Sequence, residues 1–457
     1  MRTLKKSIRT LLSIGILCLV WEVLAITANN TALVPGLPEL FVALGKLWVT
    51  PEFYLSVLAT LGRGVAGLLV SGVLALLFAL LFARHEQVYG LFKPLLTLMR
   101  SVPVISFILL ALLFLQPEQI PFMIAFLTMF PLLSENLTKG LLHLRAPLSV
   151  MGMVFHMNRT NRFTQIVYPQ IKPFLFSGLA SAAGFGWRAI IMGEVLSQCA
   201  FGIGSEMKRA QTFIEVPELL AWTVIAVALS FAFDRGLDRL SRLDIPVRYR
   251  KTDCAPATCG GPEVILEQVS VGYGHRMVLD NLSIRFEGGR VYGLSAPSGR
   301  GKTTLLRLID GSLKPASGKI GKGNIQAIAA VFQEPALLNH LSATDNIALP
   351  LASFYTKEKS MQLARHFCSL MELDEVAEHR PEALSYGQQQ RVAIARALAF
   401  PSPLLLMDEP FKGLDEALTA RIINQIKALH KINKQTIIFV SHQPDSLSLL
   451  ADETIKL

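Results

Sequence analysis

A glycine-rich segment at residues 295–304, SAPSGRGKTT, has the residue types that bind phosphate groups. An apolar stretch typical of a β-strand precedes it, and a helical pattern follows from Leu305. In this context consecutive backbone N–H groups surround phosphate oxygens at a helix N-terminus. Lys302 can then reach the outer phosphates, and the Thr303 hydroxyl can ligate Mg²⁺. The segment predicts a nucleotide site made of Ser298, Gly299, Arg300, Gly301, Lys302, Thr303 and Thr304.

One residue of this loop departs from the pattern G-x-x-x-x-G-K-[ST]. Ala296 stands where the first glycine belongs. An alanine fits that position if its φ is negative, and it is strained if a positive φ is required. We expect nucleotide binding to survive this substitution.

Further motifs follow this loop in a fixed order. They are Gln333 in VFQEP, LSYGQ at 384–388, PLLLMDEP at 403–410, GLD at 413–415, and His442 after the strand-like TIIFV. In this order the segments resemble the Q-loop, signature, Walker B, D-loop and switch motifs of the ATPase domain of ABC transporters. The resemblance implies an α/β P-loop ATPase domain with a helical subdomain, which binds ATP and Mg²⁺.

The same resemblance implies a role for each matching residue. Glu409 is the expected general base toward the attacking water, and His442 is expected to hydrogen-bond the γ-phosphate. The implied catalytic residues are Glu409, His442, Gln333 and Lys302, and the implied Mg²⁺ ligands are Thr303, Gln333 and Asp408. Further implied nucleotide contacts are Tyr273, Gln333, Ser385, Gly387, Asp408 and Asp415.

The signature segment implies a second copy of the chain. In the family, the residues matched by Ser385 and Gly387 close over the ATP that is held by another ATPase domain. With one ATPase domain per chain, a homodimer is the simplest complete assembly. Tyr386 replaces the first glycine of the family's signature.

The first 245 residues contain apolar runs that are long enough to cross a membrane. The whole chain has a mean hydropathy of +0.44 and 17% charged residues, and the apolar excess lies in this half. About 20 helical residues are needed to cross the bilayer core. The runs predict an all-α, six-span membrane domain, with spans at about 11–26, 62–83, 91–115, 120–138, 174–197 and 217–234.

Charge is unevenly distributed along the chain, whose formal net charge is +10. Residues 1–250 carry 22 Lys and Arg against 13 Asp and Glu, and the remainder carries 22 against 21. The surplus flanks the apolar runs, as the positive-inside rule requires, and does not form a nucleic-acid-binding face. We therefore expect a multi-pass protein of the cytoplasmic (inner) membrane, with both termini in the cytoplasm and with no nucleic-acid partner.

Several stretches of this half resemble importer permeases. VPGLPEL at 34–40, the run 56–83 and WRAIIMGEVL at 187–196 are similar to permeases of the nitrate/sulfonate/taurine importer family. The inner loop 139–173 resembles the family's coupling segment, because IVYP at 166–169 keeps the end of its motif although the front is degenerate. The resemblance implies an extracytoplasmic solute-binding protein as partner and a small, often anionic solute.

Two charged residues, Arg188 and Glu194, lie within the predicted span 174–197. Charges inside a membrane span are costly and usually face the bundle interior or a water-filled path. Trp187 and Glu194 are seven residues apart and so share a helix face. Two interpretations remain open: these residues line the translocation pathway, or they pair with neighbouring helices or dimer contacts.

The predicted organisation is a membrane permease domain at 1–245, a linker at 246–262 and an ABC ATPase domain at 263–457. The linker sequence, PVRYRKTDCAPATCGGP, has no apolar periodicity and ends in Gly-Gly-Pro. This order predicts an ATP-driven importer, with permease and ATPase fused in one chain. The alternatives are an ABC exporter and a non-transport ABC ATPase that acts as a regulator.

Overall fold

The computed structural model describes residues 2–28, 34–254, 260–273, 276–297, 299–323, 325 and 327–457. The chain divides into two compact units. The helical unit comprises Met1–Leu144 and Gln170–Asp244, and the α/β unit comprises Arg145–Pro169 and Ile245–Leu457. The predicted fold class, a helical domain followed by an α/β domain, is confirmed.

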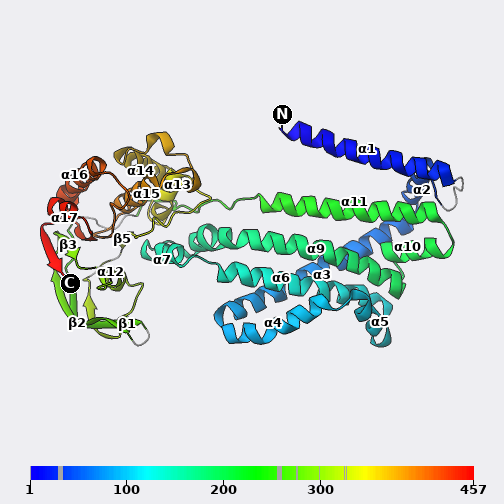
Figure 1. The fold of residues 1–457 in the computed structure, drawn as a ribbon, viewed down its shortest axis with the longest axis horizontal. Helices are drawn as coiled ribbons and strands as arrows, with labels where there is room; N and C mark the ends of the chain where they lie inside the picture. The colour runs from blue at the N-terminus through cyan, green and yellow to red at the C-terminus, as the bar shows by residue number, and fades with distance from the viewer. Residues whose placement is uncertain are drawn as a thin grey trace. The chain divides into compact units, whose positions relative to one another are not determined.

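The helical unit is built from long helices that run alongside one another (Figure 1). Proline stands in the first turn of several of them, where its missing N–H has no helical partner to lose. The elements are α1 (Arg2–Ala28), α2 (Leu37–Leu47), α3 (Pro51–Arg84), α4 (Glu86–Ser101), α5 (Val104–Phe114), the 3₁₀ turn η1 (Pro117–Gln119), α6 (Ile120–Leu142), α9 (Tyr168–Ser197), α10 (Ile203–Thr212) and α11 (Val216–Ser241).

Among the described residues, four helical stretches are long and apolar enough to cross a membrane. These stretches contain four of the six predicted spans, which are those at 62–83, 120–138, 174–197 and 217–234. The four stretches are Pro51–Arg84, Pro117–Leu142, Arg159–Ser197 and Val216–Ser241.

The predicted span at 91–115 is wrong as a single helix. The chain forms α4 and α5 there, and these two helices are bent by 92°. Val102 between them is extended, because the residue before a proline, here Pro103, is disfavoured in the helical region. The described part of the chain therefore has four helices that are long and apolar enough to span a membrane, or five such elements if the bent pair counts as one. The predicted first span, 11–26, lies within α1 but is partly outside the residues whose side chains are described.

Small residues let α3 approach α6 closely. The buried stripe of α3 includes Ser71, Ala75 and Ala79, spaced four residues apart so that they share one face. A Cβ added at Gly67 would lie 2.8 Å from the Cβ of Ala125 on α6. Helices in a membrane associate through such close packing, since lipid is as apolar as the side chains.

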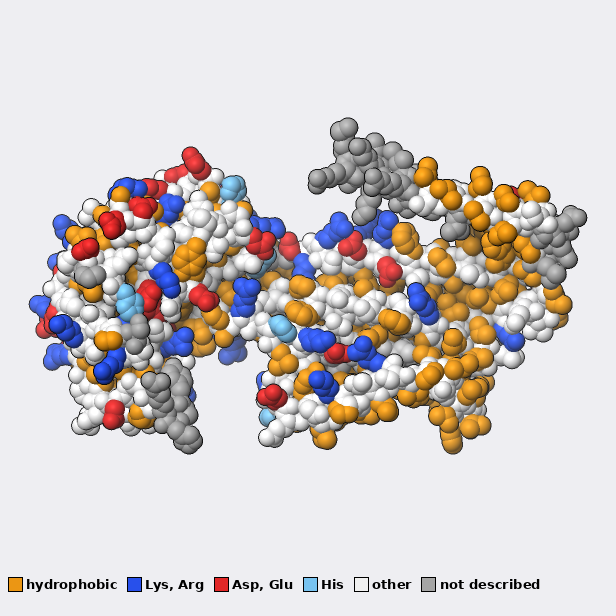
Figure 2. Space-filling model, in the orientation of Figure 1, with side chains coloured by type: hydrophobic (Ala, Val, Ile, Leu, Met, Phe, Trp, Pro, Cys, Tyr) orange, Lys and Arg blue, Asp and Glu red, His pale blue; other side chains and the backbone are white. Residues whose placement is uncertain are grey.

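The outward faces of these helices are apolar. Leu69, Val73 and Leu77 of α3 are among the exposed large hydrophobic residues of this unit. Figure 2 shows hydrophobic side chains gathered over the visible face of the helical unit, whereas the visible face of the α/β unit is a mixture of both charges. An exposed apolar face of this extent is what a lipid-facing surface requires.

The α/β unit contains two sheets. Five strands form a parallel sheet in the order β5-β6-β7-β3-β8, and three form an antiparallel sheet in the order β2-β1-β4. All five residues of β6 and of β7 are buried, as in parallel sheets that are covered on both faces. The strands are β1 (Val264–Tyr273), β2 (Arg276–Phe286), β3 (Val291–Ser295), β4 (Ser317–Gly321), β5 (Ile328–Val331), β6 (Leu404–Asp408), β7 (Thr436–Val440) and β8 (Glu453–Lys456).

Helices cover this parallel sheet, and a group of them forms the expected helical subdomain between β5 and β6. They are α12 (Lys302–Asp310), α13 (Ala343–Leu351), α14 (Lys357–Leu370), η3 (Asp374–Val376), η4 (Pro381–Ala383), α15 (Tyr386–Ala399), α16 (Glu416–Asn433) and α17 (Pro444–Leu450).

Residues 145–169 belong to the α/β unit by their contacts, although they lie between helices of the helical unit in the sequence. Leu148, Met151 and Phe155 are buried in the same hydrophobic cluster as helices α13 to α15. We call residues 145–169 the coupling segment. Its elements are α7 (Ala146–Val154), α8 (Arg159–Asn161) and the π-helix η2 (Arg162–Val167).

Candidate nucleotide-binding site

The candidate site lies where neighbouring parallel strands end. Strands β6, β7 and β3 are adjacent in the sheet. The glycine-rich loop follows β3, Asp408 and Glu409 stand at the end of β6, and His442 follows β7. The carboxyl ends of parallel strands meet at one edge, which is where ligands bind in open α/β sheets. Residues far apart in the sequence are thereby brought together.

Two glycines give the phosphate loop its shape. Gly299 and Gly301 have φ values of +83° and +90°, a region that residues with a Cβ rarely adopt. A Cβ at Gly301 would also lie 2.8 Å from Leu279. Ala296 is not among the described residues with positive φ, so the alanine fits without strain. The Lys302 ammonium is almost fully buried and donates to the carbonyl oxygens of Ala296 at 2.5 Å and Pro297 at 3.2 Å.

Asp408 lies at the buried end of β6, beside the first turn of α12. Burial raises the pKa of its carboxyl, and a hydrogen bond from Thr303 acts in the opposite direction. A carboxylate and a hydroxyl side by side are oxygen ligands of the kind that Mg²⁺ prefers, with the remaining positions left to phosphate and water. The donor set at this edge therefore fits Mg²⁺ bound together with a nucleotide.

Glu409 and His442 form a pair. The imidazole Nε2 of His442 lies 3.3 Å from the Glu409 carboxylate. Glu409 has a φ of +49°, and its N–H donates to the Val440 carbonyl at 3.0 Å. A non-glycine residue in this conformation is held there by its surroundings, and such residues cluster at functional sites.

A cavity of about 740 Å³ opens at this edge. Ten predicted site residues line it: Gly299, Arg300, Gly301, Lys302, Thr303, Thr304, Gln333, Asp408, Glu409 and His442. Met277 and Val278 of β2 also line it, and the sequence interpretation missed both. They offer the apolar surface on which a flat base can rest. Their position just after the predicted Tyr273 was the signal for them.

The other predicted site residues lie elsewhere or outside the described side chains. Ser385 is the N-cap of α15 and accepts from the Gln388 N–H, and Asp415 caps α16 in the same way through the Leu418 N–H. Neither residue, nor Gly387, lines the cavity. Ser298 and the side chain of Tyr273 lie outside the described part of the structure.

Comparison with known proteins assigns both halves. A family model described as "ABC transporter" matches residues 279–412, and one described as "Binding-protein-dependent transport system inner membrane component" matches residues 40–242. The probable sulfate/thiosulfate import ATP-binding protein CysA of Chlorella vulgaris is 36% identical over 208 residues, which cover 42% of this chain and 86% of that protein. The chain belongs to the ABC transporter family. It joins a permease-type membrane domain to an ABC ATPase domain.

Other relatives also match less than half of the chain. The spermidine/putrescine import ATP-binding protein PotA of Treponema pallidum (strain Nichols) is 37% identical over 203 residues, 42% of this chain and 54% of that protein. The matched region thus spans only about half the length of these curated relatives. A solved dimeric ATP-binding cassette with ADP and Pi is 31% identical, with a TM-score of 0.40, over 42% of this chain and 94% of that one.

Arg396 connects three parts of the α/β unit, and sequence reasoning missed it. It lies on α15, the helix that begins at the predicted signature, and it is fully buried. Its guanidinium donates to the carbonyls of Pro335 and Ala336, at 2.9 and 2.8 Å, just after Gln333. It also lies 5.4 Å from the centre of the Phe155 ring in the coupling segment. Burial lowers the pKa of Arg396 to about 9.

Tyr386, the departure in the predicted signature, contacts the Gln333 and Gly413 regions of its own chain. Its hydroxyl donates to the Gln333 carbonyl at 3.3 Å. A Cβ at Gly413, which has a φ of +78°, would lie 2.8 Å from the Tyr386 ring. The ring therefore rests on the predicted D-loop, close to the predicted Q-loop.

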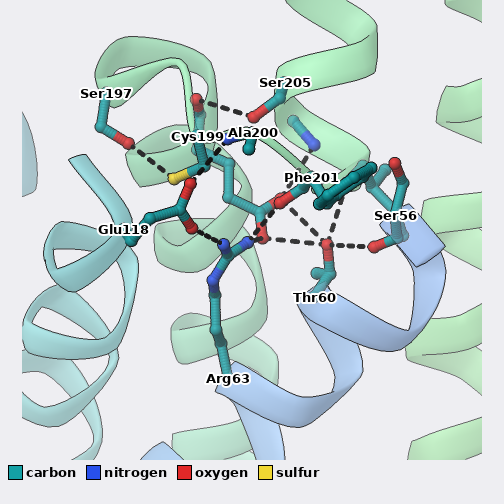
Figure 3. Close-up of polar contacts among 12 residues, drawn as sticks. Ser56, Thr60, Arg63, Glu118, Ser197, Cys199, Ala200, Phe201 and Ser205 are labelled. Carbon is teal, nitrogen blue, oxygen red and sulfur yellow. Dashed lines mark hydrogen bonds and ion pairs between the residues drawn. The ribbon is translucent and has the colours of Figure 1, made fainter. Parts of the chain in front are cut away.

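In the ABC membrane domain, Glu194 is fully buried and paired. It accepts from Thr60 and Arg63 of α3 at 2.9 and 2.7 Å, and from the Gly204 N–H at 2.9 Å. Figure 3 shows Arg63 directed toward Glu118, which it meets at 2.5 Å. For Glu194, the contacts support one of the two interpretations, which is pairing with neighbouring helices. Arg188 is exposed on α9.

Proposed function

We propose that this chain is half of an ATP-driven importer, in which two copies together form one transporter. A single observation carries the proposal. Both family models match the same chain in order, and the coupling segment, from within the permease match, is buried in the core of the ATPase half. A permease whose loop is part of the ATPase core can transmit nucleotide-dependent movement to its helices. We retain the domain boundaries 1–245, 246–262 and 263–457.

The proposed ATP site uses the edge of the parallel sheet. Lys302 and the N–H groups of the phosphate loop bind the phosphates, and Thr303 and Asp408 hold Mg²⁺ with Gln333. When bound, Mg²⁺ supplies positive charge that stabilises the transferred phosphoryl group. Glu409 accepts a proton from the attacking water. His442 lies 3.3 Å from the Glu409 carboxylate, orients this carboxylate and hydrogen-bonds the γ-phosphate.

The proposed dimer follows from the residues that do not line the cavity. Ser385, Gly387 and Asp415 lie outside their own chain's nucleotide cavity. In a two-fold dimer they contact the nucleotide that is held by the partner. Each chain then supplies half of two ATP sites, and the membrane half of each chain supplies half of the translocation pathway.

The proposed solute is small and anionic, such as nitrate, taurine or another sulfonate, and an extracytoplasmic binding protein delivers it. This proposal rests on the resemblance of the membrane half to permeases for such solutes. The ATPase half does not select a solute, since its relatives are named for the import of spermidine, sulfate and iron alike. The positive charges next to the spans favour an inner-membrane protein with both termini in the cytoplasm.

Uptake by intact cells tests this function. Cells that lack this chain are compared with cells complemented by the wild type or by Glu409→Gln, using labelled nitrate, taurine and a second sulfonate. We expect uptake of one of these solutes to fall on deletion and to return with the wild type only. Unchanged uptake of all three would overturn the proposed solute class. Accumulation of one of these solutes on deletion would favour an exporter.

A further inference from the structure

The segment 245–254, which directly follows the helical unit, is bound along its length by the rest of the α/β unit. We call these residues the strap. They form no helix or strand, so their backbone groups need partners from elsewhere. Two parts of the α/β unit supply them: the coupling segment and the end of α13 with the turn that follows it.

Asn161 of the coupling segment pairs with the strap backbone in both directions. Its side-chain amide donates to the Arg248 carbonyl at 2.9 Å, and its side-chain carbonyl accepts from the Arg248 N–H at 2.9 Å. The Asn161 side chain is fully buried, whereas the Arg248 side chain is exposed. The contact therefore depends on the backbone of residue 248 and not on its charge.

Gln165 adds a second attachment from the same segment. Its amide donates to the Ile245 carbonyl at 2.7 Å, and its side-chain oxygen lies 3.2 Å from the His340 ring nitrogen. Gln165 lies in the π-helix η2 and is almost fully buried. A π-helical turn within a helix is rare and is often found at functional positions.

The opposite end of the strap is bound by the ATPase domain. The N–H groups of Arg250 and Cys254 donate to the carbonyls of Ala352 and Phe354, at 3.2 and 2.7 Å. The Thr356 N–H donates to the Asp253 carboxylate at 2.8 Å. The strap is thus fixed at one end by the coupling segment and at the other by the turn after α13.

Side chains of the strap alternate in burial. Val247 and Tyr249 are partly buried, and Arg248 and Arg250 are exposed. Val247 packs against the hydrophobic cluster that contains Phe155 and Phe400. Burial raises the pKa of Tyr249 to about 12. An extended segment with one apolar face and paired backbone groups is a structural element and not a loose tether.

We propose that the strap locks the coupling segment onto the ATPase domain, and that Asn161 is the positioning residue of this lock. Movement of the helical subdomain on nucleotide binding then pulls on the strap and the coupling segment together. The claim that the strap transmits nucleotide-dependent movement rests on the proposed function. The claim that the strap holds the coupling segment on the ATPase domain does not rest on it.

Proteolysis of the purified full-length chain tests the lock through two variants of the same residue. Arg248→Ala removes an exposed side chain and keeps both hydrogen bonds between the residue 248 backbone and Asn161. Arg248→Pro removes the N–H that donates to the Asn161 side-chain carbonyl. Two rates are measured: trypsin cleavage after Arg250 and Lys251, and amide hydrogen exchange over residues 245–254. We expect Arg248→Ala to resemble the wild type, and Arg248→Pro to be cleaved about tenfold faster or more, because local opening controls both rates. Equal rates for the two variants would overturn the lock, as would rapid cleavage of the wild type.

A second pair of variants tests Asn161 directly. Asn161→Leu keeps the side-chain volume and loses both bonds, and Asn424→Leu makes the same change on the exposed face of α16. We expect only Asn161→Leu to expose the strap. We also expect its kcat for ATP hydrolysis to change while its KM for ATP stays within about twofold, since the strap lines no part of the nucleotide cavity. An exposed strap with unchanged kcat would overturn the coupling role and leave the ATPase assignment intact.

Discussion

At the scale of single residues, the nucleotide edge depends on backbone conformations that its neighbours impose. Glu409 keeps a φ of +49° because its N–H is bound by the Val440 carbonyl and its own carbonyl accepts from the buried Gln390 amide at 3.4 Å. Its carboxylate faces His442 as a result. The strain is thus part of how the site presents its proposed base.

Glu409→Gln is the direct test of that base. The amide has nearly the same shape but cannot accept the proton of the attacking water. We expect ATP binding to be kept and hydrolysis to fall by a factor of about 10² or more, as is typical for loss of a general base. Binding is measured with labelled ATP and turnover by phosphate release. Near-normal turnover would exclude Glu409 as the base.

Arg396→Met tests the buried guanidinium on α15. The change keeps an unbranched apolar side chain but leaves the Pro335 and Ala336 carbonyls without their donors. We expect the α/β unit to lose about 2 kcal/mol or more, because unsatisfied buried groups carry a full desolvation cost. Arg421→Met, which removes an exposed ion pair with Glu372, should change the melting temperature little. Similar losses in the two variants would contradict this explanation.

Most residues of the candidate site could be predicted from the sequence because they follow motif spacing. Ten of them meet at one cavity. The role of Arg396 could not be predicted. Its partners are backbone carbonyls and an aromatic ring, and no pattern of side chains in the sequence indicates such contacts. The fit of Ala296 depended on a φ value that only the fold determines.

At the scale of elements, apolar length predicted six spans, and four of them lie in helices long and apolar enough to cross a membrane. Local backbone chemistry decided the outcome for the run 91–115. This run is largely apolar, but Pro103 divides it into α4 and α5. The strap shows the reverse case. Its composition predicts a linker because it lacks periodicity, yet Asn161 and Gln165, some 80 residues earlier, bind its backbone. Such order comes from the tertiary partner and leaves no local signal.

Two glycines of α3 give a matched test of how that helix packs. A Cβ at Gly67 would lie 2.8 Å from Ala125, whereas nothing lies within 4 Å of a Cβ at Gly62. We expect Gly67→Ala to destabilise the helical unit by roughly 1–3 kcal/mol through overpacking. Gly62→Ala should be neutral or stabilising, since alanine favours the helical conformation over glycine by about 1 kcal/mol. Thermal unfolding in detergent compares them, and equal effects would contradict the packing of α3 on α6.

At the scale of the whole molecule, the chain combines a permease-type domain and an ABC ATPase domain, and its sequence order predicted both. The assembly is a different matter. Ser385 and Gly387 do not line their own chain's nucleotide cavity, and this is the reason to propose that each ATP site is shared between two chains.

A mixed dimer measures this sharing most directly. Lys302→Ala impairs nucleotide binding in its own chain, and Ser385→Arg blocks the site of the partner. Each variant alone should hydrolyse almost no ATP. In a purified mixed dimer, one site carries both lesions and the other carries neither, so we expect hydrolysis to recover to about half of the wild-type rate. ATP binding at one intact site per dimer, measured alongside, checks that this site has formed. A mixed dimer with neither recovered hydrolysis nor an intact binding site would contradict the shared-site transporter.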